Sequence, residues 1–326
     1  MAVSTDMLRY ISRRFLQAIP LLIGIILVNF VIVHLAPGDP IQVLMGDAAV
    51  SPEYEAKLRH LFGLDKPIYV QLLLYFKALV RGDLGYSFFY REPVLDIISA
   101  RMLATLYLMV NALIFASIVG VISGVISAMK PYSLYDNFIT LFSIISYSLP
   151  VFWLGQMMLI YLSLKLNLFP ASGMISQREG YIGFRYALDV GYHLVLPVLT
   201  LSSRHIALTA RLTRAAMIET MSADYIVTAR AKGLSEKRVL IGHGLRNALL
   251  PVVTIVGLSF RYLLAGSVLV ETVFAWPGLG RLMYDSISMR DYPILMGILL
   301  IISASVIIVN LLTDILYGFL DPRVRY

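Results

Sequence analysis

The stretch Tyr225-Ile-Val-Thr-Ala-Arg-Ala-Lys-Gly-Leu-Ser-Glu-Lys-Arg238 lies between two long apolar segments, residues 192–213 and 248–272. Each flanking segment has about the 20 residues that a helix needs to cross the hydrocarbon core of a bilayer. A polar stretch between two such segments has to leave the lipid. The sequence therefore predicts a membrane protein that carries a compact polar loop on one face.

The composition of the whole chain supports this prediction. The 326 residues are 59% hydrophobic and only 14% charged, with a mean hydropathy of +0.79. No soluble domain of this size buries so much apolar surface. The absence of cysteine excludes disulfides and thiolate chemistry. A net charge of +7 could suggest a nucleic-acid partner, but its placement next to apolar segments favours a membrane protein with positive inner loops.

The fold class that follows is an all-α polytopic membrane helix bundle. About six segments are long and apolar enough to span a bilayer, namely 15–35, 102–129, 137–165, 192–213, 248–272 and 294–320. The first is too long for the core of a signal peptide and lacks a cleavage site after it, so we expect it to be retained.

The distribution of Lys and Arg predicts the orientation. Three arginines, Arg9, Arg13 and Arg14, precede the first span and place the N-terminus in the cytoplasm. Alternation of the spans then brings the dense basic block between 211 and 246 to the same side, together with the C-terminus. The predicted outer loops hold few basic residues, which are Lys165, Arg178, Arg185, Arg281 and Arg290.

Residues 36–100 are too polar to stay in lipid, and we expect a small helical segment outside the membrane. Pro37-Gly-Asp-Pro40 breaks the first helix. Ser51 predicts the cap of a helix that stops at Gly63, and Pro67 predicts the start of another that ends near Gly82. The predicted organisation is a cytoplasmic N-terminus with the first span (1–35), this outer segment (36–100), and a core of five spans (101–326) that includes the cytoplasmic loop 222–246.

Two features inside the predicted spans concern helix packing. Small residues recur every four positions in the second span, at Ala116, Gly120, Gly124 and Ala128, which predicts a smooth ridge for close helix contact. Ordinary packing is the plainer interpretation, and a sliding surface during gating is the functional one. In the third span, Pro150 predicts a kink, with nearby serines at 143, 146 and 148 available to bond backbone carbonyls.

The polar loop itself is predicted to be a helix, a turn and a second short helix. Ser222 and Asp224 favour the first helix start, Gly233 the stop and Ser235 the next start. Small side chains would let a partner approach, and basic ones would pair with its acids. The candidate contact residues are Tyr225, Ala229, Arg230, Ala231, Lys232, Gly233 and Leu234. The alternative is a solvated basic loop that only sets topology.

Motifs for chemistry are missing from the sequence. It contains no Gly-x4-Gly-Lys-Ser/Thr, so it has no phosphate cradle of that kind, and any ATP hydrolysis is expected in a separate subunit. It contains no His-Glu-x-x-His or Gly-x-Ser-x-Gly motif, and its five histidines form no ligand-spaced pair. We therefore expect no catalytic residue, no metal and no cofactor.

Two arginines are predicted to lie deep in the membrane, Arg204 in the fourth span and Arg261 in the fifth. A charge at such depth is costly, and it normally faces water, a cavity or a partner. The hypothesis is that both line a translocation path for anionic groups. The alternative is that either one forms a structural ion pair with a carboxylate of a neighbouring helix or subunit.

Several motifs resemble the permease subunits of ABC importers. Ala229 and Gly233 match the last Ala and the Gly of that family's Glu-Ala-Ala-x3-Gly signature, although Val227 and Thr228 replace its first two residues, as in the peptide-importer branch. Further elements resemble the B-type permeases of dipeptide and oligopeptide importers, and they are Leu35-Ala-Pro-Gly-Asp-Pro40, Gly63-Leu-Asp-Lys-Pro67, Gly82-Asp-Leu-Gly85, Glu271-Thr-Val-Phe-Ala-Trp-Pro-Gly-Leu-Gly280 and Arg290-Asp-Tyr-Pro293.

The resemblance implies a type I ABC importer permease in a prokaryotic inner membrane that moves peptides by alternating access. Its implied partners are a second homologous permease, two cytoplasmic ATP-binding subunits, an extracytoplasmic substrate-binding protein and membrane lipid, with no nucleic acid. Relatives also move nickel chelates, glutathione and other small solutes, so these stay open. A secondary transporter without an ATPase and a purely structural membrane anchor are the rival classes.

Overall fold

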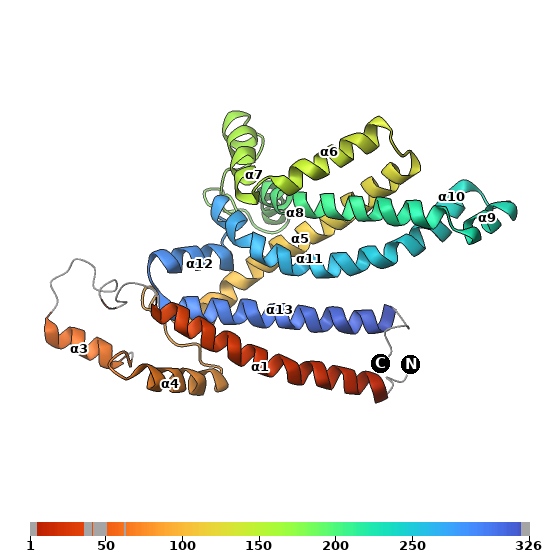
Figure 1. Ribbon diagram of the computed structural model, residues 1–326. Coiled ribbons are helices and arrows are strands. Elements are labelled where there is room, and N and C mark those ends of the chain that lie inside the picture. The colour runs from red at the N-terminus through yellow and green to blue at the C-terminus, as the bar shows by residue number, and fades with distance from the viewer. Residues whose placement is uncertain (1–4, 36–40, 42–50, 62, 321–326) are drawn as a thin grey trace. The chain divides into compact units, whose positions relative to one another are not determined.

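The computed structural model describes residues 5–35, 41, 51–61 and 63–320, and the named elements within these residues are all helices (Figure 1). An isolated bridge joins Tyr86 to Pro93. The helices of the first half are α1 (Thr5–Leu35), α3 (Pro52–Leu61), α4 (Ile68–Val80), α5 (Val94–Met129), α6 (Leu134–Ser148), α7 (Val151–Met158) and the π-helix η1 (Leu159–Lys165). Those of the second half are α8 (Phe184–Met221), α9 (Asp224–Ala231), α10 (Glu236–Arg238), the π-helix η2 (Val239–Leu245), α11 (Arg246–Val273), α12 (Leu279–Ser288) and α13 (Tyr292–Leu320).

Five of the six predicted apolar segments each lie within one helix, and the sixth, 137–165, is divided among α6, α7 and η1. The all-helical membrane fold is confirmed. By length and composition, three described helical stretches are able to cross a membrane, namely Val94–Met129, Glu236–Phe260 and Tyr292–Leu311. The bent pair α6 and α7–η1 makes a fourth if it counts as one span. The predicted count of six also includes α1 and α8, and α8 is less apolar because its sequence includes polar and charged residues, among them His193, Arg204 and His205.

The chain forms two compact units, each built from two stretches of sequence. One contains Met1–Ala104 with Gly278–Ile308, and the other contains Thr105–Pro277 with Val309–Tyr326. This division follows packing, whereas the predicted division into 1–35, 36–100 and 101–326 follows the expected side of the membrane and stays a prediction.

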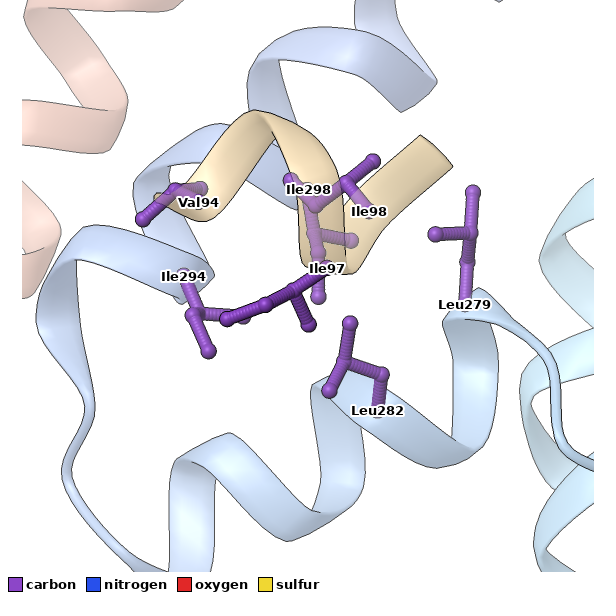
Figure 2. Close-up of a cluster of buried hydrophobic side chains, with 7 residues drawn as sticks. All are labelled: Val94, Ile97, Ile98, Leu279, Leu282, Ile294 and Ile298. Carbon is purple, nitrogen blue, oxygen red and sulfur yellow. The ribbon is translucent and has the colours of Figure 1, made fainter. Parts of the chain in front are cut away.

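The first unit has an aliphatic core. Figure 2 shows side chains from the start of α5 meeting others from α12 and the start of α13, and the buried members are Val94, Ile97, Ile98, Leu279, Leu282, Ile294 and Ile298.

A buried carboxylate organises the loop before α5. Asp291 accepts hydrogen bonds from Ser87 Oγ (2.5 Å) and Phe89 N (3.0 Å). The loop is therefore fixed to the residues that begin α13.

The outer segment has the helices that the sequence predicts. Ser51 Oγ accepts a hydrogen bond from Tyr54 N (3.4 Å) at the start of α3, and Gly63 follows α3 with a φ of +67°. Pro67 caps α4, and Gly82 follows its end with a φ of +77°. Both glycines adopt the left-handed conformation that favours glycine after a helix. The predicted break at 37–40 lies outside the described residues.

In the second unit, α8 is the central helix, with α11, α6 and α7 packed on it (Figure 1). The small-residue ridge of α5 also faces α8. A Cβ atom on Gly124 would lie 2.5 Å from the carbonyl oxygen of Ala210 and 2.6 Å from Cβ of Thr213. A Cβ atom on Gly120 would lie 2.6 Å from Cβ of Thr209. The predicted close helix contact is confirmed, because any larger side chain would separate the two helices.

The third predicted span is broken rather than kinked, which corrects the prediction at Pro150. Helix α6 ends at Ser148, α7 begins at Val151, and the two axes differ by 108°. Leu149 has an extended ψ of 135° because a residue that precedes proline is sterically driven away from the helical region. Ser143 and Ser148 donate to carbonyls of their own helix, at Ile139 and Ile144. The chain therefore turns sharply at this point.

The element after α11 forms a turn. Helix α11 ends at Val273, Ala275 has a φ of +49°, and Gly278 caps α12. Phe274 and Trp276 are buried within the protein, at 2% and 0% exposure. They contribute to the packing of the second unit, and Phe274 O accepts a hydrogen bond from Gly173 N (2.9 Å).

Candidate functional site: the loop between α8 and α11

The loop begins where α8 ends, and here the structure corrects one predicted cap. Ser222 is the C-cap of α8, directly after Met221, and its Oγ donates to the carbonyl of Glu219 (2.7 Å) instead of capping α9. Ala223 occupies the cap position of α9 without a side-chain bond, because alanine has no acceptor. Asp224 lies in the first turn as predicted, where a negative charge favours the helix N-terminus.

The end of α9 follows the prediction at Gly233. This residue has a φ of +77°, and its N–H donates to the carbonyl of Arg230 (2.9 Å). Leu234 N donates to the carbonyl of Ala229 (3.4 Å), which closes the last turn. No atom lies within 4 Å of a Cβ placed on Gly233. The backbone conformation, and not space, therefore requires glycine here.

A small apolar core holds the loop together. Ile226 and Ala229 of α9 and Val239 of η2 are buried at 0%, 6% and 0% exposure, and Met221 and Leu234 pack against them. Ala229 thus faces the inside of the loop. The contact with a partner that was predicted for Ala229 stays a prediction, but its small size is already needed for the loop's own packing.

The outer surface of the loop is polar and basic, with some exposed apolar area. Tyr225 and Val227 are 43% and 61% exposed, and Ala231, Lys232 and Gly233 are exposed as well. Arg230 pairs within the loop, where its Nε lies 2.8 Å from Oε1 of Glu236. This pair joins α9 to α10 and partly neutralises the arginine. The structure therefore leaves Lys232 as a more available cation than Arg230.

Ser235 occupies the cap position of α10, as predicted, but its side chain makes no capping bond. Its carbonyl instead accepts from Arg238 N (2.9 Å) and Val239 N (3.0 Å). One further contact was not predicted. Asn247 Nδ2 donates to the phenol oxygen Oη of Tyr225 (3.1 Å) and to the carbonyl of His243 (3.0 Å). Asn247 follows the loop directly in sequence, but spacing alone gives no sign of a bond across 22 residues.

The two deep arginines differ in what the structure describes. Arg204 lies on α8 with an exposed side chain, and its guanidinium carbon is 4.2 Å from the centroid of the Tyr147 ring. Among the described residues, no carboxylate forms an ion pair with Arg204. The alternative of an ion pair between Arg204 and a carboxylate of a neighbouring helix thus finds no partner among the described residues. Arg261 lies in α11, and its side chain is outside the described residues.

The described residues contain no group of three or more His, Asp or Glu side chains arranged to hold a metal ion.

Comparison with known proteins defines the class. Residues 120–326 match the family of binding-protein-dependent transport system inner membrane components, and residues 7–109 match the N-terminal family of such membrane components. The chain belongs to this family of transport permeases.

Similar proteins indicate which branch of this permease family the chain resembles. The dipeptide transport system permease protein of Escherichia coli (strain K12) is 42% identical, over 98% of this chain and 99% of that protein. The oligopeptide transport system permease protein of Bacillus subtilis (strain 168) is 43% identical, over 98% and 100%. The glutathione transport system permease protein of Escherichia coli O6:H1 is 40% identical, over 98% and 100%.

A solved structure shares the fold. The MetNI methionine ABC transporter, in inward-facing conformations, matches with a TM-score of 0.52 at 16% identity, over 70% of this chain and 97% of that chain. The chain therefore has the fold of an ABC importer permease.

Proposed function

We propose that the chain is one of two permease subunits of an ATP-driven importer for dipeptides or oligopeptides. Relatives that carry dipeptide or oligopeptide transport in their names match over nearly their full length, which supports a peptide as the cargo. The proposed partners are a second permease, two cytoplasmic ATP-binding subunits and an external substrate-binding protein. The proposed location is a prokaryotic inner membrane, with both termini in the cytoplasm.

The observation that carries the coupling part of this proposal is the construction of the loop 222–246. Its interior is packed by Ile226, Ala229 and Val239, and its turn is fixed by the left-handed Gly233. Such a loop moves as one body. The face with Tyr225, Ala231, Lys232 and Gly233 is exposed and suits contact with an ATP-binding subunit. ATP-driven closure of that subunit would then push the loop and, through it, α8 and α11.

Glutathione is a second candidate cargo, because a glutathione permease is 40% identical over the full length. Glutathione is itself a small peptide with free carboxylates, so the same chemistry would serve both. Arg204 is proposed to line the translocation path and to attract the carboxylate of the solute. Arg261 is proposed to line the path as well.

The test uses the complex that co-purifies with the tagged chain from its native membrane. Reconstituted into proteoliposomes with its binding protein, it should take up a labelled dipeptide only when ATP is supplied. Unlabelled glutathione and a nickel chelate serve as competitors to rank the cargo classes. Uptake that needs an ion gradient and no ATP would favour a secondary transporter, and no uptake with any of these solutes would contradict the proposal.

A further inference from the structure

The ion pair between Asp136 and Arg214 joins two helices close to the loop. Arg214 Nε lies 2.6 Å from Oδ1 of Asp136, and Arg214 Nη2 lies 2.8 Å from Oδ2. This is a bidentate contact, which fixes orientation as well as distance. Asp136 is in the first turn of α6, and Arg214 is on α8, ten residues before α9 begins at Asp224.

The same carboxylate also fixes the turn between α5 and α6. Asp136 Oδ2 accepts a hydrogen bond from Tyr132 N (2.8 Å), and Tyr132 has a φ of +61°. Asp136 N donates in turn to Ser133 Oγ (3.3 Å). The side chain of Asp136 is only 3% exposed. Separating the pair would leave a buried carboxylate without its cation, which is strongly unfavourable. The two helices are therefore expected to stay joined throughout a transport cycle.

A continuous packed route leads from the loop to this pair. The loop core contains Met221, which also packs with Met217 and Ala248 in a second buried cluster. A Cβ atom on Gly244 would lie 2.7 Å from Sδ of Met221, so η2 presses directly on the end of α8. Met217 lies on α8 about one turn after Arg214, between the ion pair and the loop. Displacement of the loop must move this end of α8.

On the other side of the pair, α6 leads to the sharp bend at Leu149 and Pro150. Helix α7 beyond the bend packs on α8 and α11. A Cβ atom on Gly155 of α7 would lie 3.2 Å from Cγ2 of Thr200 and 3.3 Å from Cε2 of Phe274. The broken pair of helices is thus attached to α8 at both of its ends, and the attachment nearest the loop is Asp136.

We propose that Asp136 and Arg214 are positioning residues that transmit displacement of the loop from α8 to α6, so that ATP hydrolysis and solute movement stay coupled. This rests on the proposed function, since it assumes that an ATPase pushes the loop. A contact that merely stabilised the fold would affect assembly and thermal stability, but it would leave the number of ATP molecules hydrolysed per transported solute unchanged.

The test measures that ratio in the reconstituted complex, using Asp136→Asn, Arg214→Gln, Arg214→Lys and the double variant Asp136→Asn/Arg214→Gln. The double variant matters because it removes both charges and so leaves no buried ion without a partner. Arg59→Gln is the matched control. It removes an ion pair of similar length, from Arg59 Nη2 to Glu55 Oε1 (2.9 Å), whose two half-exposed side chains both lie on α3.

We expect the single neutral variants and the double variant to raise the ATP consumed per transported peptide by about tenfold, a typical size for coupling between sites. Arg214→Lys keeps the charge and should recover much of the coupling, and the control should match the wild type. A wild-type ratio in the double variant would overturn the inference, as would equal ratios in all variants with only the melting temperature lowered.

The outcome separates this inference from the proposed function. If Gly233→Val in the loop uncouples transport while the Asp136 variants do not, the loop has its proposed role and the ion pair does not transmit. If neither loop nor ion-pair variants change ATPase stimulation, the proposed contact with an ATPase is wrong, and with it the inference.

Discussion

Arg204 shows how a charged side chain is held within a predicted membrane span. Its depth in the span is evident from the sequence, and that depth predicted contact with water, a cavity or a partner. Its stacking on Tyr147 was not predicted, because the two residues are 57 positions apart and no sequence pattern links a cation to a ring at that separation. A cation–π contact contributes about 0.5–1 kcal/mol at exposed sites, so it leaves the guanidinium available to an anion.

Replacing Arg204 by Gln is expected to slow uptake of a peptide with a free carboxylate by about tenfold, because a hydrogen bond to a charged group contributes about 1.5–3 kcal/mol. Uptake of the amidated peptide should change much less. Arg185→Gln, on the same helix but outside the predicted span, is the matched control. Arg261→Gln is tested in parallel. An equal loss for both peptides, or dissociation of the complex, would indicate a structural role instead.

Gly124 supports a prediction about packing alone. Gly124→Ala should destabilise the protein by about 1–3 kcal/mol, because the added methyl group collides with the backbone of α8 at Ala210 and with Thr213. Gly191→Ala is the control, since nothing lies within 4 Å of a Cβ there and the residue is also in a helix. The measurement is the thermal unfolding of the detergent-solubilised protein. Equal melting temperatures would show that α5 and α8 separate without cost.

At the scale of elements, local rules predicted helix ends well where backbone conformation decides them. Gly63, Gly82 and Gly233 each end or follow a helix in the left-handed region, as their sequence context indicates. The rules failed at Ser222, which could either start α9 or end α8. Ser222 has the chemistry of a helix start, but α8 extends to Met221 and uses Ser222 as its end. Tertiary packing of Met217 and Met221 favours this longer α8.

The loop between α8 and α11 is tested by Gly233→Val. A β-branched residue at a φ of +77° should destabilise the turn by at least about 1–2 kcal/mol, displacing α10 from α9. We expect insertion into the membrane to persist and substrate-stimulated ATPase activity to be lost. Gly242→Val is the control, because Gly242 is in the same loop without a positive φ or a close neighbour. Wild-type stimulation in Gly233→Val would contradict the docking role.

Ala229→Glu gives a related expectation with a different cause. Its side chain would enter the core formed with Ile226 and Val239, and the buried carboxylate would have no cation there. The loop should therefore lose its packing, which limited proteolysis of the assembled complex detects. If Ala229→Glu left the loop resistant to protease, Ala229 would have to face outward in the assembled protein.

For the whole molecule, the all-helical class and the positions of the long apolar segments were predictable because they follow from composition and length. The grouping into two units was not, since the first unit joins stretches about 170 residues apart in sequence and the second joins stretches about 30 residues apart. The core of the first unit, for example, combines Val94 of α5 with Ile294 of α13. No periodic pattern in either helix identifies the other as its partner.

The orientation of the molecule follows from its charges and is the last prediction. The basic block 211–246 and the arginines before α1 predict that the loop and both termini face the cytoplasm, with 36–100 outside. The chain has no cysteine, so a single introduced cysteine reports one position without background. Lys57 on α3 and Lys232 in the loop are both exposed. A membrane-impermeant maleimide added to intact cells should label Lys57→Cys and should label Lys232→Cys only after permeabilisation. The reverse pattern would show that the predicted orientation of every span is inverted, because an odd number of spans places the two positions on opposite sides of the membrane. Labelling of both positions in intact cells would mean that an even number of spans, and not the predicted three, lies between them. The loop would then face the outside, where it could not contact a cytoplasmic ATP-binding subunit.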